Sequence, residues 1–461
     1  MPLPMSPQDS LFLIGESRAN PLHVSAVQLF SAPEGVDADG LREMFVARLD
    51  ADASDTAPLL RRRPIRSLTS FGQWAWTTDE RFDVEHHVRR TALPSPGSER
   101  VLLDLCARLH ALPLERDRPL WEMHLIEGLS DGRFAVYTKI HHSLTDGVGA
   151  VRLLRAALSD DPAQRDMPAP WEAGSAWNAR APRTSGFDAA AISSAVLRGA
   201  RSAVGDAAGM VPALASTMTH ALGETGGPVN VAAPQTIFNV SIGSARRYSA
   251  RTWPLERLRL VAKLNDASIN DVVLAMSSGA LRAYLQERNA LPDRSLVAMV
   301  PVSLSDDAAP RQGNDVGVLM CPLGTHLDDP AERLAGISAC MAEGKRTLRS
   351  MSGTQILAMS ALGAAPVGAS LLFGHQRVVR PPFNLIISNV PGPKEPLYWN
   401  GARLDALYPM SVPVAGQGLN ITSLSNDDSI TFGVTACRRA MPDATMLTDH
   451  LDRELTALES V

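Results

Sequence analysis

Residues 133–158 read RFAVYTKIHHSLTDGVGAVRLLRAAL, and this stretch indicates the fold class of the chain. Its first part alternates like a half-buried strand, with Phe134, Val136 and Ile140 on one face. In its last part the apolar residues recur at helical spacing, until a polar run that ends in Pro162 stops the pattern. The stretch therefore predicts a strand, a turn and a helix, as in an α/β protein.

The predicted turn carries residues suited to acid–base chemistry. His141 and His142 end the strand, and Asp146 and Gly147 begin the helix. Because neighbouring side chains on an extended chain face opposite ways, only one imidazole can enter a given pocket. A histidine suits proton removal from a hydroxyl, since its ordinary pKa of about 6.5 leaves it largely neutral at neutral pH. We expect Asp146 to anchor the helix start and Gly147 to let the backbone turn tightly.

A histidine pair also has other common interpretations. Adjacent histidines often lie in a core or on a surface, and for His86 and His87 a structural or substrate-adjacent role is expected, because no turn with an acid follows them. A metal site at the turn is disfavoured, since the two imidazoles diverge and, apart from Asp146, no further ligand stands at a suitable spacing. We therefore expect no metal. The sequence also lacks a Gly-x-Ser-x-Gly elbow, a Gly-x-Gly-x-x-Gly loop and a P-loop, which disfavours serine hydrolases and nucleotide-binding enzymes.

The whole-chain composition restricts the class and the partners of the protein. Its 461 residues, 45% hydrophobic and 20% charged, predict a globular protein of two domains. A net charge of −5 gives no general attraction to nucleic acid. The four cysteines form no Cys-x-x-Cys pair, and the N-terminus shows no basic stretch before an apolar one. We therefore expect a cytoplasmic protein, with a peripheral position on the inner membrane face or on lipid inclusions also open.

The patterns divide the chain into two structured parts and a crossover. Residues 1–165 and 237–461 carry the regular patterns, whereas residues 166–236 are rich in Pro, Gly, Ala and Ser and predict a partly helical connection. In the second part, Ser268 and Asp271 have the spacing of a capping box before a helix. The buried stripe predicted for that helix comprises Ile269, Val272, Val273, Met276, Ala280, Tyr284 and Leu285. Further strands are predicted at residues 296–302, 316–323, 383–390 and 429–435.

One uncharged segment, residues 350–374, has the length of a membrane span. Its glycines, serines and single proline disfavour that interpretation. One or two buried or surface-seated helices are expected instead, and a helix pair that lines an acyl pocket or contacts lipid is the functional alternative.

Several motifs together resemble one enzyme family. The segment HHSLTDG at 141–147 looks like the HHxxxDG motif of CoA-dependent acyltransferases. PLWE at 119–122, SIND at 268–271 and SNVPGP at 388–393 resemble the companion motifs of bacterial wax ester synthase/diacylglycerol acyltransferases. The opening MSPQDSLF, PLHV and the segment FDVEHHVR also fit that family. Gln8, Leu22 and Ser268 depart from its usual pattern without touching an identified catalytic atom.

The resemblance implies a fold and a reaction. The fold is two chloramphenicol-acetyltransferase-like α/β halves, each a mixed sheet with helices, with a channel between them for acyl-CoA and alcohol. In the reaction His142 would deprotonate the alcohol, His141 and Asp146 would support the loop, and the alkoxide would attack the thioester directly. The substrates would be a long-chain acyl-CoA and a fatty alcohol or diacylglycerol, with no cofactor beyond the acyl-CoA.

The companion motifs supply further candidate residues. Asn270 is a candidate oxyanion donor through its side-chain amide, and helix capping is the equal alternative. Asn389 is expected to be a turn or domain-bridging residue, because Pro-Gly-Pro follows shortly after it. Structural support is expected from Asp271, and packing beneath the motif strand from Pro119, Leu120 and Trp121. Residues 210–218 and 356–373 are candidates for the acyl pocket or for lipid contact, with a plain core role equally open.

Two other functions remain open from sequence. A condensation-type enzyme on the same motif would join an amine instead of an alcohol, although no carrier domain is appended. A non-catalytic lipid-binding or lipid-droplet coat protein would use the fold without turnover. The intact HHxxxDG motif argues against the second of these.

Overall fold

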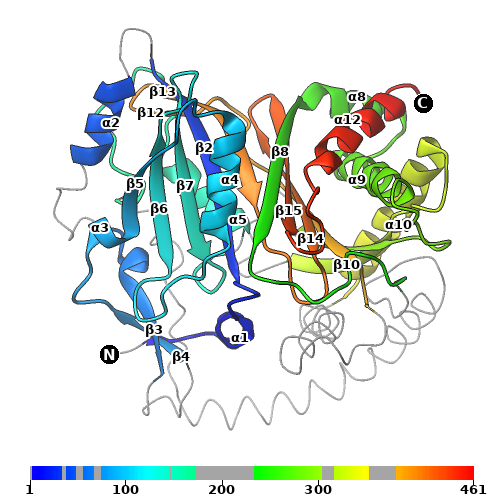
Figure 1. The fold of residues 1–461 in the computed structure, drawn as a ribbon, viewed down its shortest axis with the longest axis horizontal. Helices are drawn as coiled ribbons and strands as arrows, with labels where there is room; N and C mark the ends of the chain where they lie inside the picture. Colours follow the sequence, from blue (N-terminus) through cyan, green and yellow to red (C-terminus); the bar gives the residue numbers. More distant parts are fainter. Residues whose placement is uncertain are drawn as a thin grey trace.

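A computed structural model of the chain places two sheet-based halves side by side (Figure 1). The structure describes residues 3–33, 38–47, 56–66, 74–145, 147–172, 233–303, 316–351 and 381–461. Asp146, most of the predicted crossover, and the candidate acyl-pocket segments 210–218 and 356–373 lie outside the described residues. The uncharged segment 350–374 is described only as far as Met351.

The first half is built on a six-stranded mixed sheet, in which β5 and β6 are parallel and the other neighbours antiparallel. The strands in spatial order are β12 (Tyr398–Trp399), β13 (Ala402–Met410), β2 (His23–Ser31), β7 (Phe134–His141), β6 (Trp121–Glu127) and β5 (Val88–Ala92). Two of these strands come from the C-terminal part of the chain. The first sheet is therefore completed by residues beyond 237, which the local sequence patterns did not indicate.

Helices cover both faces of this sheet. α5 (Gly147–Ala156) packs on one face and α4 (Glu99–His110) on the other. The other helices of this half are α1 (Pro7–Gly15), α2 (Ala38–Ala47) and α3 (Val84–His87). A 3₁₀ turn at Pro58–Arg61 leads into a small separate sheet of β1 (Leu3–Pro4), β4 (Trp74–Thr78) and β3 (Arg62–Arg66).

The strand that leads into the motif was predicted as half-buried, and that prediction is wrong. All eight residues of β7 are buried. Phe134, Val136 and Ile140 share one face, as expected, and pack there with Leu153 of α5. The opposite face packs against α4, where Tyr137 contacts the cluster of apolar residues on that helix. Because β7 is an inner strand with a helix on each face, its polar residues are buried as well.

The second half repeats the design on another six-stranded mixed sheet. Its strands in spatial order are β10 (Val316–Pro322), β9 (Val297–Ser303), β11 (Leu385–Val390), β14 (Leu419–Asn426), β15 (Ser429–Cys437) and β8 (Arg246–Pro254), with β11 parallel to both neighbours. Its helices are α8 (Leu255–Leu264), α9 (Ile269–Gln286), α10 (Pro330–Arg349) and α12 (Met446–Leu458). The predicted α/β class with two mixed-sheet halves is confirmed.

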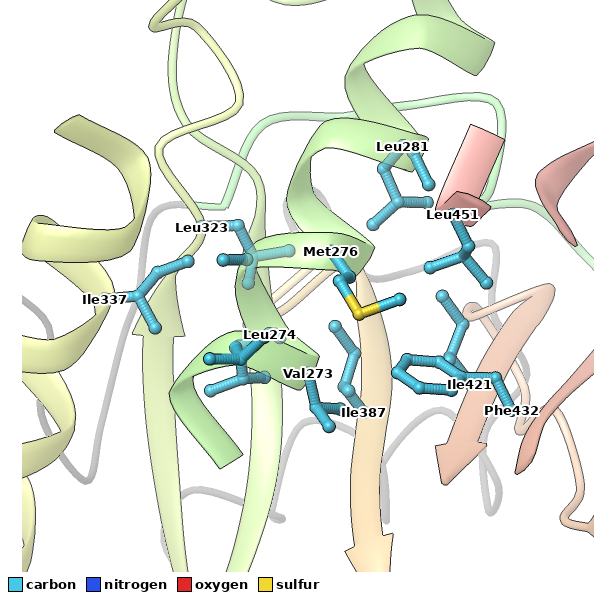
Figure 2. Close-up of a cluster of buried hydrophobic side chains, with 14 of the residues drawn as sticks. Val273, Leu274, Met276, Leu281, Leu323, Ile337, Ile387, Ile421, Phe432 and Leu451 are labelled. Carbon is cyan, nitrogen blue, oxygen red and sulfur yellow. The ribbon is translucent and has the colours of Figure 1, made fainter. Parts of the chain in front are cut away.

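The central helix of the second half, α9, starts as predicted. Ser268 accepts from the amide of Asp271, and the Asp271 carboxylate accepts from the amide of Ser268, which completes the capping box. The predicted buried stripe is too narrow, since every residue from 271 to 281 is buried, whereas its first predicted member, Ile269, is only partly buried. In Figure 2 Val273 and Met276 lie against the strand residues Ile387, Ile421 and Phe432, while α8, α10 and α12 also pack on α9. Between residues 271 and 281 the helix therefore has no solvent face.

The two halves meet along β13 of the first sheet. The Tyr248 hydroxyl of β8 donates to the carbonyl oxygen of Pro409 (2.9 Å). A Cβ added at Gly433 of β15 would lie 2.1 Å from that same oxygen, so only glycine permits this close approach. Leu154 of α5 joins Leu407 and Leu424 in an apolar cluster that spans both sheets. The helix that follows the motif therefore lies at the junction of the halves.

Candidate active site

The motif loop runs from the end of β7 to the start of α5. His141 is fully buried, whereas His142 is half-buried. The His142 imidazole stacks on the ring of Phe12 in α1, with centroids 5.1 Å apart and planes 17° apart. The two imidazoles thus lie in different environments, as the extended backbone predicts. Of the two imidazoles, that of His142 is therefore the one that is not enclosed in the core.

Ser143 contacts Nδ1 of His141 through two groups. Its Nδ1 accepts from the backbone amide of Ser143 (3.1 Å) and lies 2.7 Å from the Ser143 hydroxyl. Because a backbone amide can only donate, Nδ1 carries no proton. In the neutral imidazole the proton is therefore on Nε2. That atom makes no hydrogen bond within the described part of the chain, and Oε1 of Glu16 lies 3.5 Å from it.

The Glu16 carboxylate is buried beside the motif, with only 4% of its side chain exposed. Its Oε2 accepts from Nε (3.1 Å) and Nη2 (3.0 Å) of Arg116, and its Oε1 accepts from the amide of Leu22 (3.3 Å). Burial by itself would raise the pKa of Glu16, but His141, the Leu22 amide and Arg116 together hold it below the ordinary value. The carboxylate is therefore ionised at neutral pH.

Leu22, the residue before β2, connects Glu16 with His142 through its backbone. The Leu22 amide donates to Glu16, and the Leu22 carbonyl accepts from the amide of His142 (3.1 Å). Strand pairing of β2 with β7 fixes this geometry, since His23 is in register with His141. The histidine pair is thus held from the α1 side by both side-chain and main-chain contacts.

A buried ion pair lies on the same face of the first sheet as His141. The Lys139 ammonium is completely buried, 2.6 Å from Oε1 of Glu122 on β6. It also donates to the carbonyl oxygens of Leu109 (2.9 Å) and Leu112 (3.0 Å) at the end of α4. The pKa of Glu122 is about 2, because its contacts with His124 and Lys139 outweigh the effect of burial, which would raise it. This pair ties the motif strand to α4.

The segment PLW packs beneath the motif strand, as predicted. Leu120 and Trp121 are buried, and the Leu120 carbonyl accepts from the amide of His141 (3.0 Å). The indole of Trp121 donates to the carbonyl of Leu60 (2.7 Å) and stacks on His87, with centroids 4.7 Å apart. Burial lowers the pKa of His87 to about 4, so it is neutral. In the second histidine pair, His87 is therefore a packing residue.

Asn270 lies in the first turn of α9, but it does not cap the helix. Ser268 and Asp271 form the cap. The Nδ2 atom of Asn270 is buried and has no hydrogen-bond partner among the described residues. An unpaired buried amide costs stability, so its presence in a folded protein requires an explanation. The capping alternative is therefore wrong, and the donor role of Asn270 stays a prediction.

The SNVPGP segment reaches the motif through its strand. Asn389 lies within β11 and accepts from the Ser423 hydroxyl of β14 (2.9 Å), so the expectation of a turn residue is wrong. Its neighbour Val390 lies close to the start of α5, 3.8 Å from where a Cβ of Gly147 would be. The side chain of Asn389 therefore forms a hydrogen bond within the second sheet. The contact with the first half is made by its neighbour Val390.

The structure therefore brings together the motif loop, the PLW segment, the chain opening and Val390. Phe12, Glu16 and Arg116 were not singled out from sequence, and only the inclusion of Phe12 in the opening MSPQDSLF hinted at a role. Within the described ranges no cluster of three or more His, Cys, Asp or Glu side chains is placed to hold a metal ion. In the same part of the chain no helix has the length and apolar character needed to cross a bilayer.

Comparison with known proteins gives consistent results. The family model of the wax ester synthase/diacylglycerol acyltransferase catalytic domain matches residues 5–273, and that of the WS/DGAT C-terminal domain matches residues 312–459. A putative diacylglycerol O-acyltransferase of Mycobacterium tuberculosis is 48% identical over 100% of this chain and 92% of its own length. A probable diacylglycerol O-acyltransferase of the same species is 45% identical over 99% of this chain and 98% of its own.

Solved structures agree. The wax ester synthase/diacylglycerol acyltransferase from Marinobacter aquaeolei VT8 superimposes with a TM-score of 0.77 at 36% identity, over 99% of both chains. The first condensation domain of the calcium-dependent antibiotic synthetase gives a TM-score of 0.59 at 16% identity, over 100% of this chain and 97% of its own, and shares the fold alone. From its family matches, its relatives and its structure, this chain belongs to the wax ester synthase/diacylglycerol acyltransferase family and is an acyltransferase.

Proposed function

We propose that this enzyme transfers a long-chain acyl group from acyl-CoA to the hydroxyl of a fatty alcohol or a diacylglycerol, with His142 as general base. The observation that carries the proposal is the contrast within the motif: His141 is enclosed, whereas His142 is half-buried on the loop that leads into α5, the helix at the junction of the halves. The relatives named as diacylglycerol O-acyltransferases support the same substrate class.

In the proposed reaction, the neutral imidazole of His142 takes the proton of the acceptor hydroxyl. The alkoxide oxygen then attacks the thioester carbonyl carbon, and the carbonyl oxygen becomes negative. The tetrahedral intermediate collapses with loss of the CoA thiolate, which takes the proton back from His142. General-base catalysis of this kind contributes about 10²- to 10⁴-fold to the rate. The reaction needs no metal or further cofactor, since acyl-CoA is a substrate.

The developing oxyanion requires a donor, and Asn270 is the proposed one. Its amide Nδ2 has no hydrogen-bond partner among the described residues, and the helix cap at that place is supplied by other residues. A preorganised amide that binds the oxyanion is worth about 10²- to 10³-fold in kcat. Asp146 and His141 are proposed to support the loop that positions His142.

Peripheral contact with a membrane or a lipid inclusion is also part of the proposal. Leu11 and Ile14 of α1 are 65% and 49% exposed, and they flank Phe12, which stacks on His142. Exposed apolar side chains beside a lipid-processing site suit contact with a lipid surface. A cytoplasmic enzyme with this helix against the lipid could take its acceptor from there.

An acceptor screen with palmitoyl-CoA tests the substrate class. Thiol release and product are measured with fatty alcohols of several lengths, with mono- and diacylglycerols, and with hexadecylamine as the matched amine. We expect ester products from the alcohols or the diacylglycerol. Amide formation that exceeds ester formation would indicate a condensation-type enzyme instead, and acyl-CoA binding without thiol release would indicate a lipid-binding protein.

A further inference from the structure

The C-terminal end of α1 holds a carboxylate against the motif. Glu16 is the C-cap residue of α1, and its backbone amide donates to the carbonyl of Phe12. Consequently, one short helix places the Phe12 ring on His142 and the Glu16 carboxylate beside His141. The contacts to both histidines come from a segment far from the motif in the sequence.

We propose that Glu16 is a positioning residue for acyl transfer: its buried carboxylate fixes His141 in the Nε2–H tautomer and thereby holds the loop that presents His142. This proposal rests on the proposed role of His142 as base.

The geometry around His141 supports one tautomer only. Its Nδ1 faces the amide of Ser143, so a proton on Nδ1 would place two donors against each other. Its Nε2 faces Oε1 of Glu16 at 3.5 Å, so a lone pair there would face a carboxylate. Both contacts therefore favour the Nε2–H form, and the carboxylate also gives the buried N–H an electrostatic partner.

The carboxylate is itself held in place. Arg116 contributes two hydrogen bonds to Oε2, and the Leu22 amide contributes one to Oε1. Since the Leu22 carbonyl accepts from the amide of His142, displacement of Glu16 would loosen both histidines at once. Small displacements of a catalytic group cost up to about 100-fold in rate.

Steady-state kinetics and histidine NMR test the proposal on the full chain. The acyl-transfer variants are Glu16→Ala, Glu16→Gln, Arg116→Gln and His142→Ala, and circular dichroism verifies folding. We expect Glu16→Ala to lower kcat by up to about 100-fold with KM for palmitoyl-CoA within about twofold. Glu16→Gln should recover most of that loss, because its amide oxygen can accept from Nε2–H. Arg116→Gln should lose less than Glu16→Ala, since it leaves the carboxylate in place.

The tautomer is measured separately, with ¹⁵N-labelled histidine in long-range ¹H–¹⁵N spectra, where His141→Gln identifies the signals of residue 141. We expect the Nε2–H pattern in the wild type. In Glu16→Ala we expect a mixture, because the loop that holds the Ser143 amide on Nδ1 is then no longer fixed through Leu22. If Glu16→Ala fails to fold, Glu16→Asp takes its place with the same expected loss, because it keeps the charge for Arg116 but draws the carboxylate away from His141.

The outcomes are distinct. A folded Glu16→Ala variant with wild-type kcat, a Glu16→Gln variant as slow as Glu16→Ala, or an unchanged His141 tautomer in Glu16→Ala would each overturn the role of Glu16. Retained activity in His142→Ala would instead overturn the proposed function, and the NMR measurement would still decide the tautomer question.

Discussion

Replacement of Lys139 by methionine should strongly destabilise the protein. The ammonium group is completely buried, 2.6 Å from Glu122, and binds two carbonyl oxygens at the end of α4. Methionine has a similar length but no charge, so the Glu122 carboxylate would remain buried without its counter-ion. Loss of one partner of a buried pair costs about 3–5 kcal/mol. We expect a loss of about 4 kcal/mol in the free energy of unfolding at pH 7.

Urea unfolding followed by tryptophan fluorescence measures this loss. The matched controls are Glu122→Gln and the double variant Lys139→Met/Glu122→Gln. Because the second substitution removes the unpaired charge, the double variant should be more stable than the sum of the single losses predicts, by about 1–3 kcal/mol. A Lys139→Met protein within about 1 kcal/mol of the wild type, or losses that simply add, would refute the assignment of a buried, coupled pair.

Three further predictions follow from the structure. The pKa of His87 is about 4 in the folded chain and about 6.5 in the unfolded chain, so the unfolded chain binds more protons between these pH values. The free energy of unfolding should therefore fall by up to about 3 kcal/mol as the pH is lowered through that window. In urea titrations, His87→Gln should remove this part of the pH dependence. Gly433→Ala should cost about 1–3 kcal/mol, since its Cβ would meet the carbonyl oxygen of Pro409, and an unchanged urea midpoint would argue against close packing of the halves. Asn270→Ala should lower kcat by about 10²- to 10³-fold with unchanged unfolding, and a wild-type kcat would exclude the amide as oxyanion donor.

Local patterns predicted much of the architecture. The strand, turn and helix around the motif, the capping box of α9 and the further strands appear within a residue or two of their predicted bounds. These features depend on periodicity and on contacts between residues three or four positions apart, which the sequence displays directly. The family resemblance, which rested on several motifs in order, is confirmed.

Features set by long-range pairing could not be read from the same patterns. Burial of both faces of β7 depends on helices from elsewhere in the chain, and β13 enters the first sheet from the C-terminal part. The contact between Glu16 and His141 likewise joins segments that are distant in the sequence. The limits of the two halves and the crossover, the role of Asp146 and the acyl-pocket segments stay predictions.

Acyl transfer by His142→Ala tests the role of His142 as general base most directly. Thiol release from palmitoyl-CoA is measured with the best acceptor of the screen, after circular dichroism and urea unfolding have shown that the variant folds like the wild type. Removal of the general base should lower kcat by about 10²- to 10⁴-fold while acyl-CoA still binds. A folded His142→Ala enzyme that retains wild-type turnover would contradict the assignment of the base, and with it the proposed mechanism.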